Sequence, residues 1–331
     1  MLRQGEYLNG TYRLLEEIGS GGGGIVYKAY HERLQSYVVV KRMKEQVKGL
    51  LDGRAEVDVL KNLKHTYLPR VYDFLQIGGE IYTVMDFIPG QSLDKVLKQN
   101  RRIPRELLLR WMTQLAEALA YLHSQTPPVI HSDIKPSNIM VTPEENICLI
   151  DFNISLVFDH SIRTSSGISG GYSPPEQYPD FPTYQRLARP ERRQEDPGTA
   201  SATDGIVAQI VGRGVDGSSD IYSLGASFYH LATGIRPGRD FDRIVPIDRC
   251  GTDLGEGMIT ILKKSMELRP EARYQDGGQL LYALQHIHEL DSEYQRKQRR
   301  RKRRKLCLAV LFLSLVLALG GGFFLWQKEK D

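Results

Sequence analysis

The order of apolar and polar positions along the chain predicts a β-rich first part and a helical second part. Residues 12–30 read YRLLEEIG, SGGGG and IVYKAY, which predicts two strands joined by a glycine turn. The β-branched run Tyr37–Lys41 and the apolar run that begins residues 82–93, before a Pro-Gly pair, predict two more strands. From Pro104 to His123 an apolar residue recurs every three or four positions, which predicts a buried helix with Leu108, Trp111, Met112, Leu115, Leu119 and Leu122 on its core face.

Three later segments complete this pattern. Residues 259–289 show helical spacing and are expected to end the globular part. Residues 178–217 are rich in Pro, Arg, Asp, Gly and Thr without any period, which predicts a long loop. Leu306–Trp326 contains no charged residue and has the length of a helix that spans a bilayer.

The charge distribution changes the meaning of the net charge of +4. Of the 44 Lys and Arg residues, nine lie within Arg296–Lys305 and two in the last five residues, which leaves 33 against 38 Asp and Glu in residues 1–295. A mildly acidic globular part does not favour nucleic-acid binding. The basic run precedes the apolar run, so the positive-inside rule predicts a single-pass protein of the cell membrane with its globular part in the cytoplasm and residues 327–331 outside. Residues 296–305 are either simply solvated or attract anionic lipids, and we expect the second.

The three cysteines, Cys148, Cys250 and Cys307, are far apart and show no metal-ligand spacing. They are expected to be reduced structural thiols, as is usual in a cytosolic setting.

The polar residues with the clearest chemistry lie within residues 131–151. His131, Asp133, Lys135 and Asn138 precede a short apolar strand, and Asp151 follows directly after it. Phosphoryl transfer requires positioning, metal ligands and a group that orients the attacking hydroxyl, and these residue types supply all three. The alternative is an ordinary polar loop before a strand.

The spacing HxDxKxxN followed by DF closely resembles the catalytic loop and metal-binding segment of the protein kinase family. The resemblance extends over residues 12–290 and is closest to bacterial membrane-anchored Ser/Thr kinases. It implies an α+β bilobal protein-kinase fold with a small β-rich N-lobe, a larger helical C-lobe and one C-terminal transmembrane helix. The implied bounds are an N-lobe at 1–85, a hinge at 86–91, a C-lobe at 92–292 with the insertion at about 178–217, a basic juxtamembrane linker at 293–305, a transmembrane helix at 306–326 and a short tail at 327–331.

The resemblance also implies a nucleotide site for ATP with Mg²⁺, or with Mn²⁺ in its place. Lys41 would contact the α- and β-phosphates and pair with Glu56, while Asn138 and Asp151 would hold the metal ions. The remaining residues implied in nucleotide binding are Gly19, Gly21, Gly24 and Val26 in the glycine-rich loop, and Asp86 and Ile88 through their backbones in the hinge after Met85.

On the substrate side, the resemblance implies that Asp133 is the catalytic base and that Lys135 neutralises the transferred phosphoryl group. A lysine at this position is typical of members that act on Ser or Thr, so the expected reaction is phosphorylation of protein hydroxyls, those of the protein itself included, by a monomer or a dimer. Relative to the family, residues 178–217 are an insertion, either a passive loop or one that takes part in docking or autophosphorylation. Three structural contacts are also implied: Ser169 with Asp133 and Lys135, Glu176 of the PPE segment with Arg273, and Asp220 with the catalytic-loop backbone.

Three residues depart from the family pattern. Gly23 replaces an aromatic loop tip, Ser132 replaces the arginine that pairs with a phosphorylated activation segment, and Asn153 replaces a glycine. They support one alternative, a membrane-tethered pseudokinase that binds ATP as a scaffold. A second alternative is a kinase-fold phosphotransferase for small molecules, against which Lys135 and the PPE segment favour protein substrates. The full set of charged catalytic groups favours an active protein kinase.

Overall fold

The computed structural model describes residues 3–21, 24–43, 60–99, 103–151, 169–178, 214–238 and 240–291. Several predictions fall outside these residues: Gly23, Glu56, Asn153, most of the insertion, the basic linker, the apolar run at 306–326 and the tail. Within the described ranges, no helix has both the length and the apolar character needed to cross a membrane.

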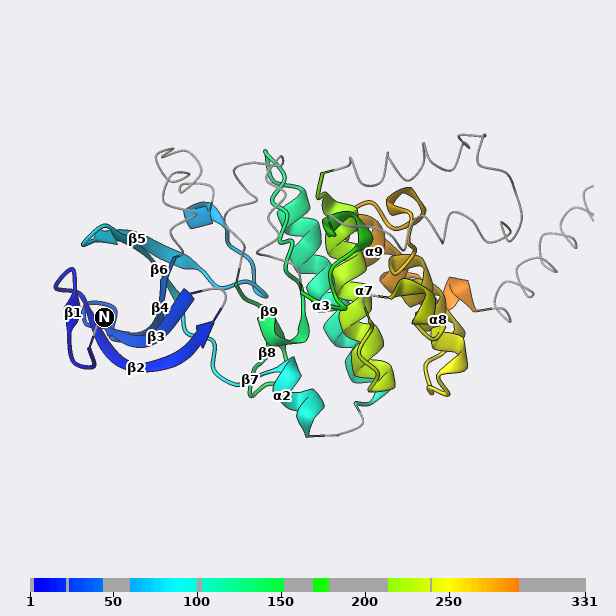
Figure 1. Cartoon of the computed structure of the whole chain (residues 1–331), viewed down its shortest axis with the longest axis horizontal. Helices are drawn as coiled ribbons and strands as arrows, with labels where there is room; N and C mark the ends of the chain where they lie inside the picture. Colours follow the sequence, from blue (N-terminus) through cyan, green and yellow to red (C-terminus); the bar gives the residue numbers. More distant parts are fainter. Residues whose placement is uncertain are drawn as a thin grey trace, which may run out of the picture.

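The first part of the chain forms a curled six-stranded antiparallel sheet, drawn at the left of Figure 1. The strand order is β1-β2-β3-β4-β6-β5. Alternate side chains of these strands, among them Leu14, Ala29, Val38, Val40 and Val84, form a core of their own, which explains the alternating sequence pattern. The strands are β1 (Tyr7–Leu8), β2 (Tyr12–Gly21), β3 (Gly24–His31), β4 (Ser36–Arg42), β5 (Val71–Ile77) and β6 (Glu80–Asp86).

The second part is mainly helical, and a small antiparallel sheet of order β7-β8-β9 lies where it meets the first. All six apolar residues predicted for the helix after Pro104 are buried in its core. The helices are α2 (Leu93–Lys98), α3 (Arg105–His123), α7 (Gly217–Thr233), α8 (Glu256–Ser265) and α9 (Gly277–Gln285), and the strands are β7 (Gln91–Ser92), β8 (Ile139–Val141) and β9 (Ile147–Leu149).

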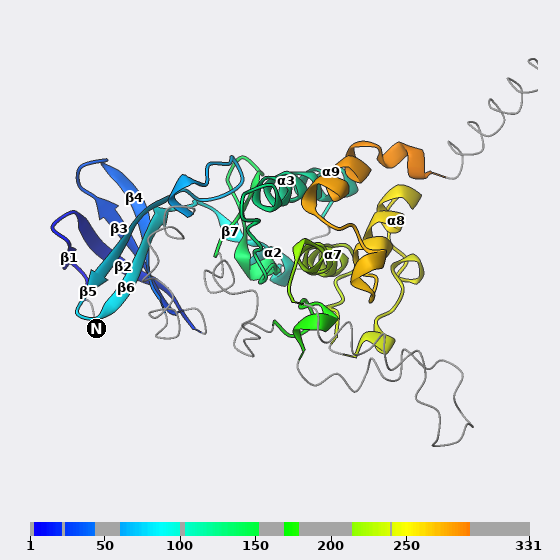
Figure 2. The same ribbon diagram turned by 90° about the horizontal axis from the view of Figure 1, so that it is seen from above.

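Helices α3 and α9 lie side by side in the helical part (Figure 2). A glycine permits this approach, because a Cβ atom on Gly277 would lie 2.2 Å from the backbone nitrogen of Ala120. Helix α7 begins at Gly217, and Asp216 and Ser219 cap it reciprocally. The last residues assigned to the insertion therefore belong to the start of this helix.

Residues 60–70 precede β5 in the chain and pack against the helical part. Although they lie within the predicted N-lobe, Leu60, Leu63 and Leu68 belong to the same hydrophobic cluster as the buried face of α3. Two backbone groups add polar contacts: the N–H of Lys64 donates to the Tyr121 hydroxyl at 2.9 Å, and the carbonyl of Tyr67 accepts from the N–H of Leu149 at 2.9 Å. This segment is thus anchored on the helical part of the molecule.

Cys148 lies in β9, as the sequence predicts, and is buried. Burial, with the nearby charge of Asp86, raises the pKa of its thiol to about 12, so the thiol remains protonated and unreactive.

Candidate active site

The loop at 131–138 is positioned by helix α7 through the buried carboxylate of Asp220. One oxygen of Asp220 accepts the backbone N–H of His131 at 2.8 Å, and the other accepts that of Ser132 at 2.7 Å. The His123 ring contacts the same carboxylate at 3.1 Å through Nε2. Because the N–H of Gly277 donates to Nδ1 of His123, the ring proton lies on Nε2 and is donated to Asp220. Asp220 thus makes the contact predicted for it. Three N–H donors compensate for the burial of its negative charge.

His131 connects this loop to the strand that ends before Asp151. Its ring is fully buried, with Nε2 3.1 Å from the carbonyl oxygen of Ile150. The N–H of Asp133 lies 3.4 Å from Nδ1 of the same ring. Both contacts are met by one neutral tautomer with its proton on Nε2. His131 therefore holds the loop against the end of this strand.

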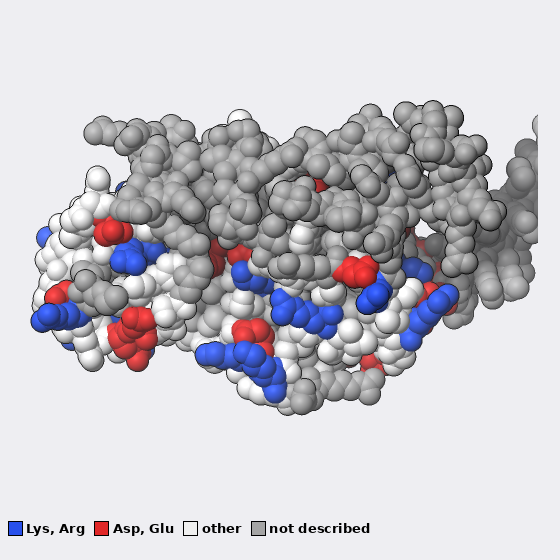
Figure 3. All heavy atoms as spheres, in the orientation of Figure 1, with Lys and Arg blue, Asp and Glu red and all other residues white. Residues whose placement is uncertain are grey.

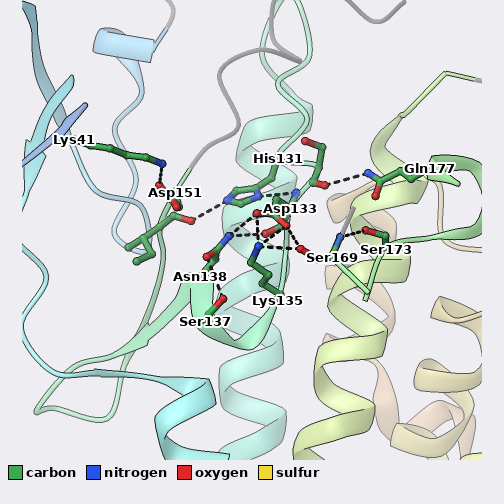
Figure 4. Close-up of polar contacts among 12 residues, drawn as sticks. Lys41, His131, Asp133, Lys135, Ser137, Asn138, Asp151, Ser169, Ser173 and Gln177 are labelled. Carbon is green, nitrogen blue, oxygen red and sulfur yellow. Dashed lines mark hydrogen bonds and ion pairs between the residues drawn. The ribbon is translucent and has the colours of Figure 1, made fainter. Parts of the chain in front are cut away.

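Asp133 is the centre of the polar network in Figure 4. Its carboxylate accepts from Lys135 at 2.7 and 3.0 Å, from the Asn138 amide at 3.0 Å and from the Ser169 hydroxyl at 2.6 Å. Lys135 also lies 2.9 Å from the Ser169 oxygen. The bridging contact predicted for Ser169 is present. These contacts fix the orientation of the carboxylate, whose side chain is 18% exposed.

Asn138 and Asp151, the predicted metal ligands, are brought together by the β8–β9 pairing. The carbonyl of Asn138 accepts from the N–H of Ile150 at 2.9 Å, directly before Asp151. The Asn138 amide nitrogen uses its two N–H groups on the backbone and side-chain oxygens of Asp133. Its side-chain oxygen, contacted only weakly by Ser137 at 3.4 Å, is therefore the atom suited to a cation.

This donor set fits Mg²⁺. The ion prefers hard oxygen ligands and commonly binds one or two carboxylates together with substrate phosphates and water. An amide oxygen and a carboxylate match that preference. In the described ranges no group of three or more His, Cys, Asp and Glu side chains could hold a metal ion.

Lys41 lies on β4 and forms an ion pair with Asp151 across the space between the two parts of the molecule (Figure 4). The sequence separation of this pair is 110 residues. The predicted partner, Glu56, lies outside the described residues. Asp151 itself adopts a left-handed backbone with φ 72°, which aspartate tolerates better than most residues.

The predicted glycine-rich loop is the β2–β3 hairpin. Gly21 pairs with Gly24 and Gly19 with Val26, and Val26 in turn pairs with Lys41 on the next strand. Gly24 has a strict backbone reason to be glycine. Its φ is 112°, and a Cβ atom would lie 2.1 Å from the carbonyl oxygen of Arg42.

The predicted hinge leaves β6 at Asp86 and passes through Ile88. The Asp86 side chain is occupied by the N–H of Arg70 at 2.8 Å and the Tyr72 hydroxyl at 2.6 Å. Burial and the hydrogen bond to Asp86 raise the pKa of Tyr72 to about 12. The backbone N–H of Asp86 is engaged as well, because it donates to the carbonyl of Arg70 at 3.0 Å. Beyond Ile88, Gly90 brings the chain against β8, where a Cβ atom would lie 1.9 Å from the carbonyl oxygen of Val141.

The pair predicted between Glu176 and Arg273 is present and buried. Its two N–O distances are 2.8 and 3.0 Å, and the remaining guanidinium N–H groups donate to the carbonyls of Glu267, Leu268 and Ser218. The ring of Tyr222 packs against the guanidinium, 4.9 Å from its centre. This arrangement fixes the segment that begins at Ser169.

The sequence did not indicate two contacts at the site. The Gln177 amide donates to the carbonyl of Ser132 at 3.1 Å, and the Arg236 guanidinium donates to the carbonyl of Gly170 at 2.6 Å. Neither pair follows a known spacing, since 45 and 66 residues separate the partners. Only the presence of a polar side chain next to the PPE segment could have suggested the first.

Comparisons with known proteins give a consistent result. The protein kinase domain family matches residues 12–186. A probable serine/threonine-protein kinase of Clostridium acetobutylicum is 28% identical over 301 residues, covering 86% of this chain and 41% of that protein. The serine/threonine-protein kinase PknA of Mycobacterium tuberculosis is 28% identical over 293 residues, covering 83% of this chain and 61% of that protein.

Among solved structures, the kinase domain of PknI from Mycobacterium tuberculosis superimposes with a TM-score of 0.62 at 20% identity. The match covers 87% of this chain and 100% of that one, which establishes the fold. The chain spans less than two thirds of the length of the two curated relatives above. The family match covers more than half of the chain, and the motifs occupy the expected places in the fold, so this chain belongs to the protein kinase domain family.

Proposed function

We propose that the protein is a serine/threonine protein kinase that transfers the γ-phosphate of Mg-ATP to protein hydroxyls, its own included. The observation that carries the proposal is the set of contacts around Asp133, whose carboxylate is held by Lys135, Asn138 and Ser169. A carboxylate fixed by three side chains is suited to orient an acceptor hydroxyl and take its proton.

The other residues have matching roles. Lys135, 2.7 Å from Asp133, places a positive charge where negative charge develops on the transferred group. Lys41, on the sheet, would bind the α- and β-phosphates, which precede the transferred γ-phosphate in ATP. Asn138 and Asp151 would hold Mg²⁺, which when bound supplies charge neutralisation for the phosphates.

The family comparison supports protein substrates, since the curated relatives carry serine/threonine-protein kinase in their names. The occurrence of Lys135 and of the buried Glu176–Arg273 pair beside the site is in keeping with this class.

The decisive experiment measures transfer of labelled γ-phosphate by the full chain, purified in detergent, to itself and to a general protein substrate. Asp133→Asn is expected to reduce transfer by about two to four orders of magnitude, the usual contribution of a positioned acid–base group, while nucleotide binding is retained. Asp240→Asn removes the carboxylate of an exposed ion pair with Arg243, outside the set of contacts around Asp133, and serves as the matched control. Equal transfer by the wild type and Asp133→Asn would contradict the proposal. ATP binding without transfer in the wild type would instead support the scaffold alternative.

We also propose that the protein is attached to the cell membrane through residues 306–326, with the kinase domain in the cytoplasm and residues 296–305 against anionic lipid. The support is the sequence, with an uncharged run of bilayer length after a basic run. Protease treatment of sealed inside-out and right-side-out vesicles tests this topology. Digestion of the kinase domain only from the extracytoplasmic side would contradict it.

A further inference from the structure

A cavity of about 520 Å³ opens from the side of the candidate active site that carries Lys135 and Ser169. Both residues contact the Asp133 carboxylate, so the cavity begins where an acceptor hydroxyl would be oriented. Its walls come from α2, from residues 135–137, from the segment at 169–172 and from the end of α7 with the turn that follows. A peptide whose hydroxyl reaches Asp133 would have its neighbouring residues in this cavity.

The charges that line the cavity are unequal. Lys98, Lys135 and Arg236 contribute positive charge, and Asp94 is the carboxylate among the lining residues. Asp94 is already engaged, because Lys98 contacts it at 3.1 Å and the Ser92 hydroxyl donates to it. Although burial opposes the effect, these hydrogen bonds hold the pKa of Asp94 below its usual value. Figure 3 shows Lys and Arg side chains gathered on this face, over α2 and beside it toward the helical part.

Arg236 is held in place by contacts that do not neutralise its positive charge. One of its N–H groups donates to the carbonyl of Gly170 at 2.6 Å, and its guanidinium lies 5.1 Å from the centre of the Tyr172 ring. The backbones meet just as closely, since a Cβ atom on Gly171, with φ 90°, would lie 1.9 Å from the carbonyl oxygen of Pro237. Among the described residues no carboxylate pairs with Arg236. A planar guanidinium fixed on one side and exposed on the other is suited to bind a carboxylate or phosphate with two parallel hydrogen bonds.

The remaining polar wall does not cancel this charge. The Tyr172 hydroxyl and Nδ1 of His230 are 2.7 Å apart. Burial, with the charge of Arg236, lowers the pKa of His230, and burial raises the pKa of Tyr172. The pair is therefore uncharged at neutral pH, and Arg236 remains the dominant charge on this wall.

We propose that this cavity selects protein substrates that carry an anionic side chain, a carboxylate or a phosphate, close to the acceptor Ser or Thr, and that Arg236 is the residue that recognises it. The inference rests on the proposed kinase function and adds the class of its substrates. Recognition by Arg236 acts on peptide binding, so its effect is expected in KM more than in kcat.

The test uses the full-length protein and peptides that share one acceptor serine and differ only in the flanking residues, which are Asn, Asp or phosphoserine. The wild type is expected to phosphorylate the Asp peptide with a kcat/KM about 10-fold or more above that of the Asn peptide, the usual effect of one charge-assisted contact. In Arg236→Gln this ratio should fall to about one, and Arg236→Lys should restore part of it. The phosphoserine peptide distinguishes the two anions, because a ratio well above that of the Asp peptide identifies phosphate as the preferred group.

Arg243→Gln is the matched control, since Arg243 is an exposed arginine that does not line the cavity, and it should retain the wild-type ratio. A wild-type ratio near one, or an unchanged ratio in Arg236→Gln, would overturn the substrate preference while leaving kinase activity intact. Absence of transfer to every peptide and to the protein itself would overturn the proposed function, and this inference with it.

Discussion

Glu176 and Arg273 form a two-pronged ion pair in which the side chains are 1% and 0% exposed. Arg273 satisfies its remaining N–H groups on three backbone carbonyls, and the Ser219 hydroxyl donates to Glu176 at 2.7 Å. The pair thereby joins the segment after Ser169 to α7 and to the turn before α9. A buried charge that loses its partner is far more costly than the pair itself.

Glu176→Gln is therefore expected to destabilise the protein by about 3–5 kcal/mol, because it leaves the Arg273 charge buried without a counter-charge. Chemical denaturation followed by fluorescence measures the change. Glu106→Gln removes a carboxylate from a pair that is more than half exposed, and should change the stability by less than about 1 kcal/mol. Similar losses in the two variants would show that burial of the pair has no special importance.

Ser169→Ala tests the hydroxyl that bridges Asp133 and Lys135. Hydrogen bonds to charged groups contribute about 1.5–3 kcal/mol, so kcat should fall by about 10- to 100-fold. Ser169→Thr keeps the hydroxyl and should retain most of the activity. The nucleotide Kd, measured by calorimetry, is expected to be unchanged in both. Weakened nucleotide binding in Ser169→Ala would assign the residue to a different role.

Gly24→Ala tests the backbone requirement in the β2–β3 hairpin. The φ of Gly24 is 112°, and the carbonyl oxygen of Arg42 leaves no room for a Cβ atom. The alanine variant is therefore expected to carry about 1–3 kcal/mol of strain and to bind the nucleotide more weakly. Gly19→Ala is the control in the same hairpin, since its Cβ atom would meet only Val26 at 4.0 Å. Thermal unfolding should show a lower Tm for Gly24→Ala and little change for Gly19→Ala. The reverse order would contradict this geometry.

His65 should make the protein less stable in mild acid. Its Nδ1 accepts the N–H of Tyr67 at 3.3 Å, its ring stacks on Tyr121, and burial lowers its pKa. The unfolded chain then binds the proton more readily than the folded one. This contribution to stability is complete above pH 6.5, the ordinary histidine pKa, and is lost as the pH falls toward the lower pKa of the folded state.

The measurement compares thermal unfolding between pH 7.5 and 5.5. His65→Phe, which keeps an aromatic ring against Tyr121, is expected to lose less stability over this range than the wild type. His288→Gln changes an exposed histidine and should follow the wild type. If His65→Phe and the wild type lose equal stability, other groups are responsible for the acid sensitivity.

Local patterns predicted local structure well. The alternation in residues 12–30 and the helical spacing after Pro104 correspond to β2, β3 and α3, because side-chain period follows backbone geometry. The spacing of Asp133, Lys135 and Asn138 was informative for the same reason. The three residues lie on one short loop, and the side chains of Lys135 and Asn138 both contact that of Asp133.

Contacts between distant segments were predictable only where the family resemblance supplied them. It gave the Glu176–Arg273 pair and the Asp220 contacts correctly. It did not give the ion pair of Lys41 with Asp151 or the position of Arg236 over Tyr172. These depend on how the sheet meets the helical part and on the path of the chain after α7, which no short spacing in the sequence encodes.

The Lys41–Asp151 ion pair has a consequence for any motion between the sheet and the helical part. Residues 60–70 contact both sides of this boundary, since Leu60, Leu63 and Leu68 share a core with α3 and Lys61 pairs with Asp73 on β5 at 3.3 Å. The Lys41–Asp151 pair joins the same two parts at a separate point. If the sheet moves away from the helical part, this ion pair must break, and the Asp151 carboxylate is freed in the same step.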